Sequence, residues 1–305
     1  MNWSFEEIDS AYGGVSEGPV WDGTALLYTR IQQSRILRYD PAAGRPQIHR
    51  ENTNYANGLA YDWQGRLLAC EGGSDEDSRR VTRTEPDGSK TVLAAAFEGK
   101  RLNIPNDLAV DTQGRIWFTD PFYEGAAGAW SQDTTHKDLL HDSVYRLDED
   151  ANGTCSITRV TFDTTRPNGL VFSRDQQTLY VAQSGRRPEE KRQLRAYPVR
   201  HDGSLGDGHV LHDFGEHRGI DGMCLDSEGN IVATAGWELG GPGPAIYVFS
   251  PDGVVIERHA VPCKRPTNCA FGDQDLETLF VTTIEGYLFR TRPERRGLAM
   301  YPLLK

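Results

Sequence analysis

The amino-acid sequence predicts an all-β fold, a six-bladed β-propeller with four antiparallel strands per blade, formed by residues 1–305 as a single domain. Three observations support this prediction: a short motif recurs six times, the copies lie about one blade apart, and no convincing amphipathic helix interrupts them. Successive copies begin 40, 49, 62, 53 and 47 residues apart. A four-stranded propeller blade needs roughly 40 to 50 residues, so six blades fill the chain without a linker.

Each copy of the motif consists of one polar residue, a short apolar run and a turn. The copies read EGPVWD, NGLAYD, NDLAVD, NGLVFS, DGMCLD and NCAFGD, and they begin at Glu17, Asn57, Asn106, Asn168, Asp221 and Asn268. The turn opens five positions later, at Asp22, Asp62, Asp111, Ser173, Asp226 and Asp273. A second apolar run then follows, as in RLLACE (66–71) and RIWFTD (115–120). Two apolar runs separated by a polar turn are typical of a β-hairpin.

The outer half of each blade is predicted from two further short runs joined by a Pro, Gly or Asp turn. Examples are RILRYDPAAGRPQIHR (35–50) and AIYVFSPDGVVIERHAV (245–261). The last hairpin, residues 287–304, comes at the end of the chain and needs a further strand. We expect the N-terminal segment from Trp3 to Ile8 to supply it, because this closes the ring and removes exposed strand edges.

The six residues that open the copies should form a ring around the propeller axis, because the blades are related by rotation. Two of them, Glu17 and Asp221, are carboxylates and the other four are asparagines, so all six offer oxygen. Oxygen donors favour a hard divalent cation such as Ca²⁺ or Mg²⁺. Asn-Gly and Asp-Gly are also strong turn signals, which is the alternative interpretation. The apolar run that follows at once, with its own turn five residues later, favours the ring.

The loops beside the ring are expected to shape a substrate pocket. A hairpin that starts at the ring runs away and returns, so the end of its second strand and the following loop lie near the ring. Glu71, Asp120, Tyr123 and Trp237 occupy such places. The connection after Asp120, residues 121–142, is the longest of its kind. We expect it to act as a lid, with a plain surface insertion as the alternative.

The motifs resemble the SMP-30/gluconolactonase/luciferin-regenerating-enzyme-like propellers, a family of calcium-dependent lactonases and esterases, over essentially the whole chain. The most specific segments are SEGPVWD (16–22), IPNDLAVDTQGRIWFTDP (104–121), RPNGLVFSRDQQTLYVA (166–182) and GIDGMCLDSEGNIVATA (219–235). The resemblance implies one Ca²⁺, with Mg²⁺, Mn²⁺ or Zn²⁺ as alternatives. The implied metal ligands are Glu17, Asn106, Asn168 and Asp221.

The resemblance further implies hydrolysis of a sugar lactone, such as glucono-1,5-lactone, to the open-chain aldonic acid. The cation would polarise the lactone carbonyl and stabilise the oxyanion, while a carboxylate accepts a proton from water. Asp221 is the expected acid/base, but a ligand carboxylate is a weakened base, so Glu17, Asp120 and Glu71 stay open as alternatives. Substrate contacts are expected from Asn57, Asn106, Asp120, Tyr123, Trp237 and Asn268.

Two other functions are compatible with the same ring. Some members of the family act as phosphotriesterases or aryl esterases with the same ligands, so a preference for lactones does not follow from the ring alone. A metal-stabilised propeller could also serve as a binding module without catalysis, because a fold does not fix a function. The sequence does not indicate the oligomeric state.

Composition excludes several classes of partner. The chain has 44 acidic and 33 basic residues, a net charge of -11, and no dense Lys/Arg block, so nucleic acid is not expected. No apolar run approaches the roughly 18 residues of a membrane-spanning helix.

The N-terminus, MNWSFEEIDS, lacks the basic and apolar regions of a secretory signal, so we expect a cytoplasmic protein. Five cysteines without a C-x-x-C pair suggest neither a disulfide framework nor a zinc knuckle.

Two further patterns are interpreted as structural. Residues 14–18, GVSEG, match the G-x-S-x-G motif of serine hydrolases at Ser16. That motif requires a following helix, whereas Pro19 and a strand-like hairpin follow here. His209, His212 and His217 cluster in HVLHDFGEH, where a strand and loop pattern fits no helical metal-binding pair.

Overall fold

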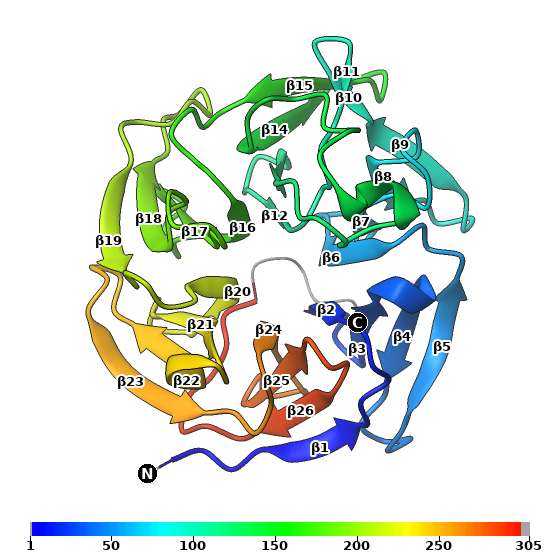
Figure 1. Ribbon diagram of the computed structural model, residues 1–305. Coiled ribbons are helices and arrows are strands. Elements are labelled where there is room, and N and C mark those ends of the chain that lie inside the picture. The colour runs from blue at the N-terminus through cyan, green and yellow to red at the C-terminus, as the bar shows by residue number, and fades with distance from the viewer. Residues whose placement is uncertain (1, 300–305) are drawn as a thin grey trace.

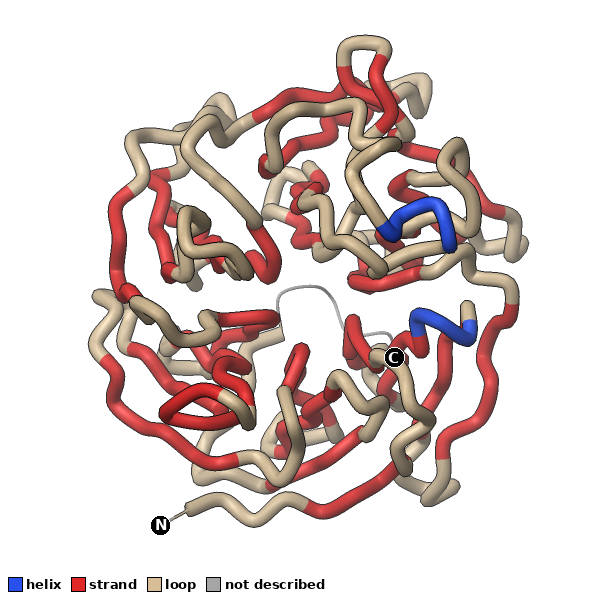
Figure 2. The backbone as a smooth tube through the Cα atoms, in the orientation of Figure 1, coloured by secondary structure: helices blue, strands red, loops and turns tan. Residues whose placement is uncertain are grey.

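The computed structural model describes residues 2–299 and confirms the six-bladed β-propeller. Six four-stranded antiparallel sheets surround a central axis (Figure 1). The helices of the described residues are two single 3₁₀ turns, drawn in blue in Figure 2. Within residues 2–299, no helix has the length and apolar character needed to cross a membrane.

Blades 1 to 3 follow one another along the chain. Blade 1 contains β2 (Ser16–Trp21), β3 (Leu26–Arg30), β4 (Arg35–Tyr39) and β5 (Pro46–Glu51), with η1 (Ile31–Gln33) between β3 and β4. Blade 2 contains β6 (Ala56–Tyr61), β7 (Leu67–Glu71), β8 (Arg80–Thr84) and β9 (Lys90–Ala94). A short ribbon of β10 (Ala96–Phe97) and β11 (Lys100–Arg101) precedes blade 3. Blade 3 contains β12 (Leu108–Val110), β13 (Ile116–Asp120), β14 (Ser143–Glu149) and β15 (Cys155–Arg159), with η2 (Ala129–Gln132) in the loop between β13 and β14.

Blades 4 to 6 complete the ring. Blade 4 contains β16 (Pro167–Phe172), β17 (Thr178–Gln183), β18 (Gln193–Pro198) and β19 (His209–Asp213). Blade 5 contains β20 (Ile220–Leu225), β21 (Ile231–Trp237), β22 (Gly240–Phe249) and β23 (Val255–Ala260). Blade 6 contains β24 (Pro266–Gly272), β25 (Thr278–Thr283) and β26 (Leu288–Thr291), and its outermost strand is β1 (Glu6–Asp9).

The N-terminal strand closes the propeller as predicted. β1 pairs antiparallel with β26, where Glu6 lies opposite Arg290 and accepts two hydrogen bonds from its guanidinium at 2.9 and 3.0 Å. The strand starts three residues later than predicted, at Glu6, and Trp3 stacks on His259 with ring centroids 3.9 Å apart. Of the predicted last hairpin, residues 292–299 form no strand and make one isolated β-bridge, between Gly297 and Asp226, while residues 300–304 lie outside the described residues.

Apolar side chains hold the blades together. The innermost strands β2, β6 and β16 are buried along their whole length, because both of their faces pack against neighbouring blades. Among the described residues, one hydrophobic cluster lies at each of the six interfaces between adjacent blades. At the interface of blades 3 and 4, for example, Trp117 meets Phe172 edge to face at 5.4 Å. This packing makes the propeller a firm support for the residues at its axis.

The predicted turns end the inner strands where expected. The carboxylate of Asp62 accepts the backbone N–H groups of Gln64 and Arg66 at 3.0 and 2.9 Å. Asp111 and Asp226 make the same pair of contacts with the residues two and four positions later. The recurring aspartate is therefore a turn residue, which separates it from the polar residue that opens each copy.

Candidate active site

The six predicted ring residues lie at the start of the innermost strands and are 4–6 % exposed. In five blades the ladder between the first two strands gains one extra residue at this point, as where Glu17 pairs with Thr29 but Val20 pairs with Leu27. Such a bulge turns a side chain out of the normal alternation and is frequent beside active sites. In blade 3, Asn106 precedes β12 and its N–H donates to the Thr119 carbonyl at 2.9 Å.

Four of the six ring residues are followed by glycine because neighbouring strands approach too closely for a side chain. These glycines are Gly18, Gly58, Gly169 and Gly222. A Cβ on Gly58 would lie 2.6 Å from the Asn106 carbonyl oxygen, and one on Gly222 would overlap the side chain of Asn268. The Asn-Gly and Asp-Gly pairs thus mark close approach at the axis, within strands, and the alternative interpretation as hairpin turns is wrong.

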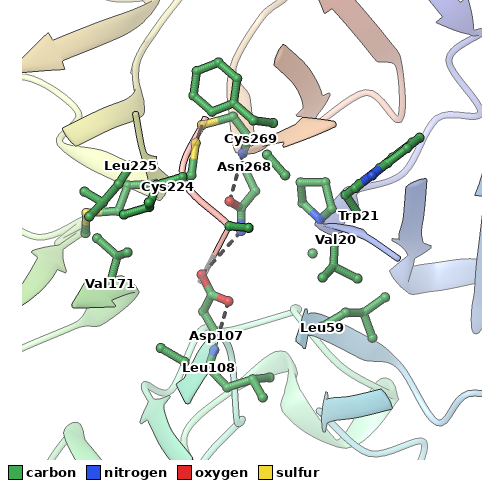
Figure 3. A pocket seen from close by; sticks show the side chains of 18 of the residues that line it. Val20, Trp21, Leu59, Asp107, Leu108, Val171, Cys224, Leu225, Asn268 and Cys269 are labelled. Carbon is green, nitrogen blue, oxygen red and sulfur yellow. Dashed lines mark hydrogen bonds between the residues drawn. The ribbon is translucent and has the colours of Figure 1, made fainter. Parts of the chain in front are cut away.

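Asp107 occupies the position of these glycines in blade 3, and sequence reasoning missed it. The Asn268 side-chain amide donates to Asp107 Oδ2 at 3.3 Å, as Figure 3 shows, and to Glu17 Oε2 at 3.1 Å. The Leu108 N–H donates to the other carboxylate oxygen at 2.9 Å. Blades 1, 3 and 6 are therefore linked through polar side chains at the axis. Only two copies lack the glycine, and the one that places a carboxylate there, Asp107, was the available signal.

Asp221 is held by residues of blades 4 and 5. The Asn168 side-chain amide donates to Asp221 Oδ1 at 2.6 Å and to the Tyr123 hydroxyl at 3.3 Å. The Arg218 guanidinium donates to Asp221 Oδ2 at 2.9 Å, and Arg265 Nε lies 3.8 Å from the same oxygen. Hydrogen bonds therefore orient both carboxylate oxygens of Asp221.

The acidic groups at the axis destabilise one another in their charged forms. Burial, together with the charges of Asp221 and Asp107, raises the pKa of Glu17 well above its usual range. Burial also raises the pKa of Asp107 to about 7. A cation among these groups would favour their ionised forms. The side-chain oxygen of Asn57 is buried without a hydrogen-bond partner, so the same region holds an unused acceptor.

A polar cavity of about 150 Å³ lies over the ring. All ring residues except Asn268 line it, and the remaining polar lining comes from Gln32, Tyr123, Glu124, Arg186, Arg218, Arg265 and Thr267. Asn268 and Asp107 instead line a second cavity, whose other walls are mostly apolar side chains such as Val20 and Leu59 (Figure 3). The row of polar contacts through Asn268 thus separates the polar cavity from the apolar one.

The structure brings only some of the predicted pocket residues to the cavity. Tyr123 lines it, whereas Asp120, Glu71 and Trp237 do not. Asp120 is fully buried and accepts the Asn103 N–H at 2.8 Å, and Glu71 pairs with Arg80 and Lys90 in blade 2. Each of these residues is the last residue of the second strand of its blade. Their carboxylates contact partners in the same blade or in the adjacent connection. Trp237 is 42 % exposed at the end of β21.

The long connection between β13 and β14 does reach the cavity. Residues 123–126 form part of its wall. The loop is fixed to blade 2, because Trp130 Nε1 donates to the Gly73 carbonyl at 2.9 Å and the Arg79 guanidinium lies 4.5 Å from the Trp130 ring. Figure 2 shows the short helical turn η2 of this loop above blade 2. That it moves as a lid stays a prediction.

The other patterns of the sequence have structural roles. Ser16 lies within β2 and its hydroxyl donates to the Gly286 carbonyl at 3.1 Å. His212 belongs to the outermost strand of blade 4 and packs edge to face on Phe214. In the part of the chain that the structure describes, no group of three or more His, Cys, Asp or Glu side chains is arranged to hold a metal ion. The ring is a different kind of donor set, because most of its oxygens belong to amides.

Comparison with known proteins identifies the family. The model of the SMP-30/Gluconolactonase/LRE-like region matches residues 15–285. The chain belongs to this family. It is similar to the gluconolactonase of Zymomonas mobilis subsp. mobilis, with 29 % identity over 290 residues, 88 % of this chain and 75 % of the relative. The pentonolactonase XacC of Haloferax volcanii is 30 % identical over 89 % of this chain and 82 % of its own length.

A solved structure of similar sequence has the same architecture. The gluconolactonase XC5397 of Xanthomonas campestris superposes with a TM-score of 0.78 and 31 % identity, covering 95 % of this chain and 90 % of that structure. The resemblance noted in the sequence motifs is therefore confirmed. The four ligands that it implies, Glu17, Asn106, Asn168 and Asp221, all line the polar cavity. Their role as ligands stays a prediction.

Proposed function

We propose that the protein hydrolyses a sugar lactone to the open-chain aldonic acid, with one divalent cation, Ca²⁺, at the ring. The observation that carries this proposal is the pair of buried carboxylates, Glu17 and Asp221, among amide oxygens in the wall of a polar cavity. The similarity to proteins named gluconolactonase and pentonolactonase supports the choice of substrate.

The residues at the ring fit a hard cation. Glu17, Asn106, Asn168 and Asp221 would hold it through oxygen atoms, and two carboxylates would balance its two charges. The raised pKa of Glu17 supports this assignment, since a nearby cation would favour the ionised carboxylate. The unpartnered side-chain oxygen of Asn57 leaves an acceptor beside the four ligands. A set without histidine or cysteine favours Ca²⁺ or Mg²⁺ over Zn²⁺. When bound, the cation would polarise the lactone carbonyl and stabilise the negative charge of the addition step.

Asp221 is the proposed base. Asn168 and Arg218 orient its two oxygens, so that the carboxylate can accept a proton from a water molecule in the cavity. Tyr123 contributes by accepting a hydrogen bond from Asn168, which keeps that amide beside Asp221. Glu17 is the second candidate for the base, because it lines the same cavity.

Acid release from glucono-1,5-lactone, measured in a pH-stat with Ca²⁺ present, tests the proposal. We expect Asp221→Asn to lower kcat by about a hundredfold or more, the usual loss for a general base. Asp207→Asn makes the same change at an exposed position outside the cavity and should retain the wild-type rate. Calorimetric titration of Ca²⁺ into each variant separates loss of the base from loss of the cation. Full activity of Asp221→Asn would contradict the assignment.

A further inference from the structure

Three arginines from three separate loops meet at the polar cavity. Arg186 follows β17, Arg218 precedes β20, and Arg265 precedes β24. The side chains of Arg218 and Arg265 are only 9 % and 18 % exposed, whereas Arg186 is exposed at the rim. Each of the three guanidinium groups carries a positive charge at neutral pH. A cavity that gathers three like charges needs an anion to compensate them.

The acidic residues of the cavity compensate only part of this charge, because Asp221 pairs with Arg218 at 2.9 Å. Three carboxylates line it, those of Glu17, Glu124 and Asp221. Glu124 is already paired with Arg166 at 3.1 Å and with Arg187 at 2.7 Å. Glu17 and Asp221 balance the cation in the proposed function. With the cation in place, the arginines of the cavity carry an excess of positive charge.

Hydrogen-bond donors of these arginines are also unused. Arg265 Nε has no hydrogen-bond partner, and its nearest carboxylate oxygen, on Asp221, is 3.8 Å away. Arg218 Nε is likewise buried and unpartnered. Within residues 2–299, the guanidinium of Arg186 makes no hydrogen bond or ion pair and lies 4.8 Å from the centre of the Tyr123 ring. Buried donors without acceptors are costly, so these groups are suited to an anionic ligand.

We propose that the substrate is a lactone that carries an anionic group outside the lactone ring, a carboxylate, a phosphate or a sulfonate, and that Arg186 and Arg265 bind this group. The inference rests on the proposed function. Guanidinium groups recognise such oxyanions through paired hydrogen bonds. Apart from the lactone group itself, a neutral aldonolactone offers only hydroxyl groups and leaves both arginines without a charged acceptor. Arg218 is already committed to Asp221 through one of its nitrogens.

A different role for the arginines makes a different prediction. Hydrolysis of any lactone creates a new carboxylate, and the arginines could bind only that group. Their replacement would then slow neutral and anionic lactones to the same extent. If the arginines bind an anionic group of the substrate, their replacement should slow the hydrolysis of anionic lactones more than that of neutral ones.

Kinetics with four lactones distinguish these roles. The substrates are glucono-1,5-lactone, a glucaric acid monolactone, 6-phosphogluconolactone and 6-deoxy-6-sulfogluconolactone, which also identify the preferred anion. We expect at least one anionic lactone to exceed glucono-1,5-lactone in kcat/KM by about tenfold or more, the size of one charge-assisted hydrogen bond. Arg265→Gln and Arg186→Gln should each reduce this ratio. Arg45→Gln removes one charge at an exposed site elsewhere and should preserve it. A preference for the neutral lactone, or a ratio that both variants leave intact, overturns the inference.

Binding of the reaction products gives a readout without turnover. Calorimetry should show glucarate binding about tenfold or more tightly than gluconate, with the difference reduced in Arg265→Gln and Arg186→Gln. Selective binding of glucarate by a protein that hydrolyses none of the lactones would contradict the proposed function and support the anion site. Hydrolysis of glucono-1,5-lactone with equal binding of both products would support the proposed function and overturn the anion site. Because Arg186 is exposed, Arg186→Gln should fold like the wild type, so a change in its binding of the products would not result from misfolding.

Discussion

Replacing Asp107 with asparagine should stabilise the cation-free protein, and more at pH 8 than at pH 5. Burial raises the pKa of Asp107 to about 7 in the folded state, against 3.8 for an ordinary aspartate. The folded protein therefore binds this proton more tightly than the unfolded chain does. It follows that stability is highest below the unfolded pKa and is lost as the pH rises from about 4 through 7. Asparagine cannot ionise and avoids this loss.

The size of the effect follows from the two pKa values. Ionising the buried carboxyl costs about 4 kcal/mol in free energy of unfolding at pH 8 and less than about 2 kcal/mol at pH 5. Asparagine keeps only one of the two oxygens that accept from Asn268 and Leu108, a loss of about 1 kcal/mol at either pH. The gain in stability of Asp107→Asn at pH 8 should therefore exceed its gain at pH 5 by about 2 to 3 kcal/mol.

Urea unfolding in the presence of a chelator measures this difference. The wild type, Asp107→Asn and the exposed control Asp252→Asn are compared at both pH values. The control removes one charge without changing the axis, so its stability should follow the wild type. An equal gain at pH 5 and pH 8, or a loss at pH 8, would refute the raised pKa of the buried Asp107 carboxyl.

Three further changes test other parts of the structure. Gly222→Ala should lower the free energy of unfolding by about 1 to 3 kcal/mol, measured by thermal or urea unfolding, because the added Cβ overlaps Asn268. Gly240→Ala has open space around it and should change the free energy of unfolding by less than about 0.5 kcal/mol. Equal effects of the two substitutions would contradict the close approach at the axis. Glu17→Gln removes one of two carboxylates and should weaken Ca²⁺ binding in calorimetry by about tenfold or more, and wild-type affinity would place the cation elsewhere. Deleting residues 2–10 exposes the edge of β26, so the melting temperature should fall and light scattering should rise, and an unchanged melting temperature would show that β1 is dispensable.

The fold and most of the ring were predictable because they repeat. Six copies place a polar residue, an apolar run and a turn at fixed offsets. The role inferred for a position in one copy can therefore be compared with the same position in the other five. Only their position within the repeat distinguishes the turn aspartates from the ring residues. The same comparison contained the signal for Asp107, which replaces the glycine found in four other copies.

The rest of the site was not predicted, because it depends on loops and on side-chain direction. Arg218 and Arg265 each lie three positions before a ring residue, Asp221 and Asn268, so the repeat contained a signal for these two arginines. Arg186 lies in a connection outside this phase, and only the assembled propeller brings it to the cavity. Asp120 and Glu71 were placed correctly at the ends of strands, but a strand alternates its faces, and both carboxylates turn toward partners away from the cavity.

Dependence of the lactonase activity on the cation is measured as the initial rate of acid release from glucono-1,5-lactone, corrected for spontaneous hydrolysis, in chelated protein and after stepwise return of Ca²⁺. Mg²⁺, Mn²⁺ and Zn²⁺ are titrated in parallel. We expect a background rate after chelation and a rate that Ca²⁺ restores in proportion to its occupancy of one site. A rate that survives chelation, or one that stays at background with every cation, would contradict a cation-dependent lactonase at the ring.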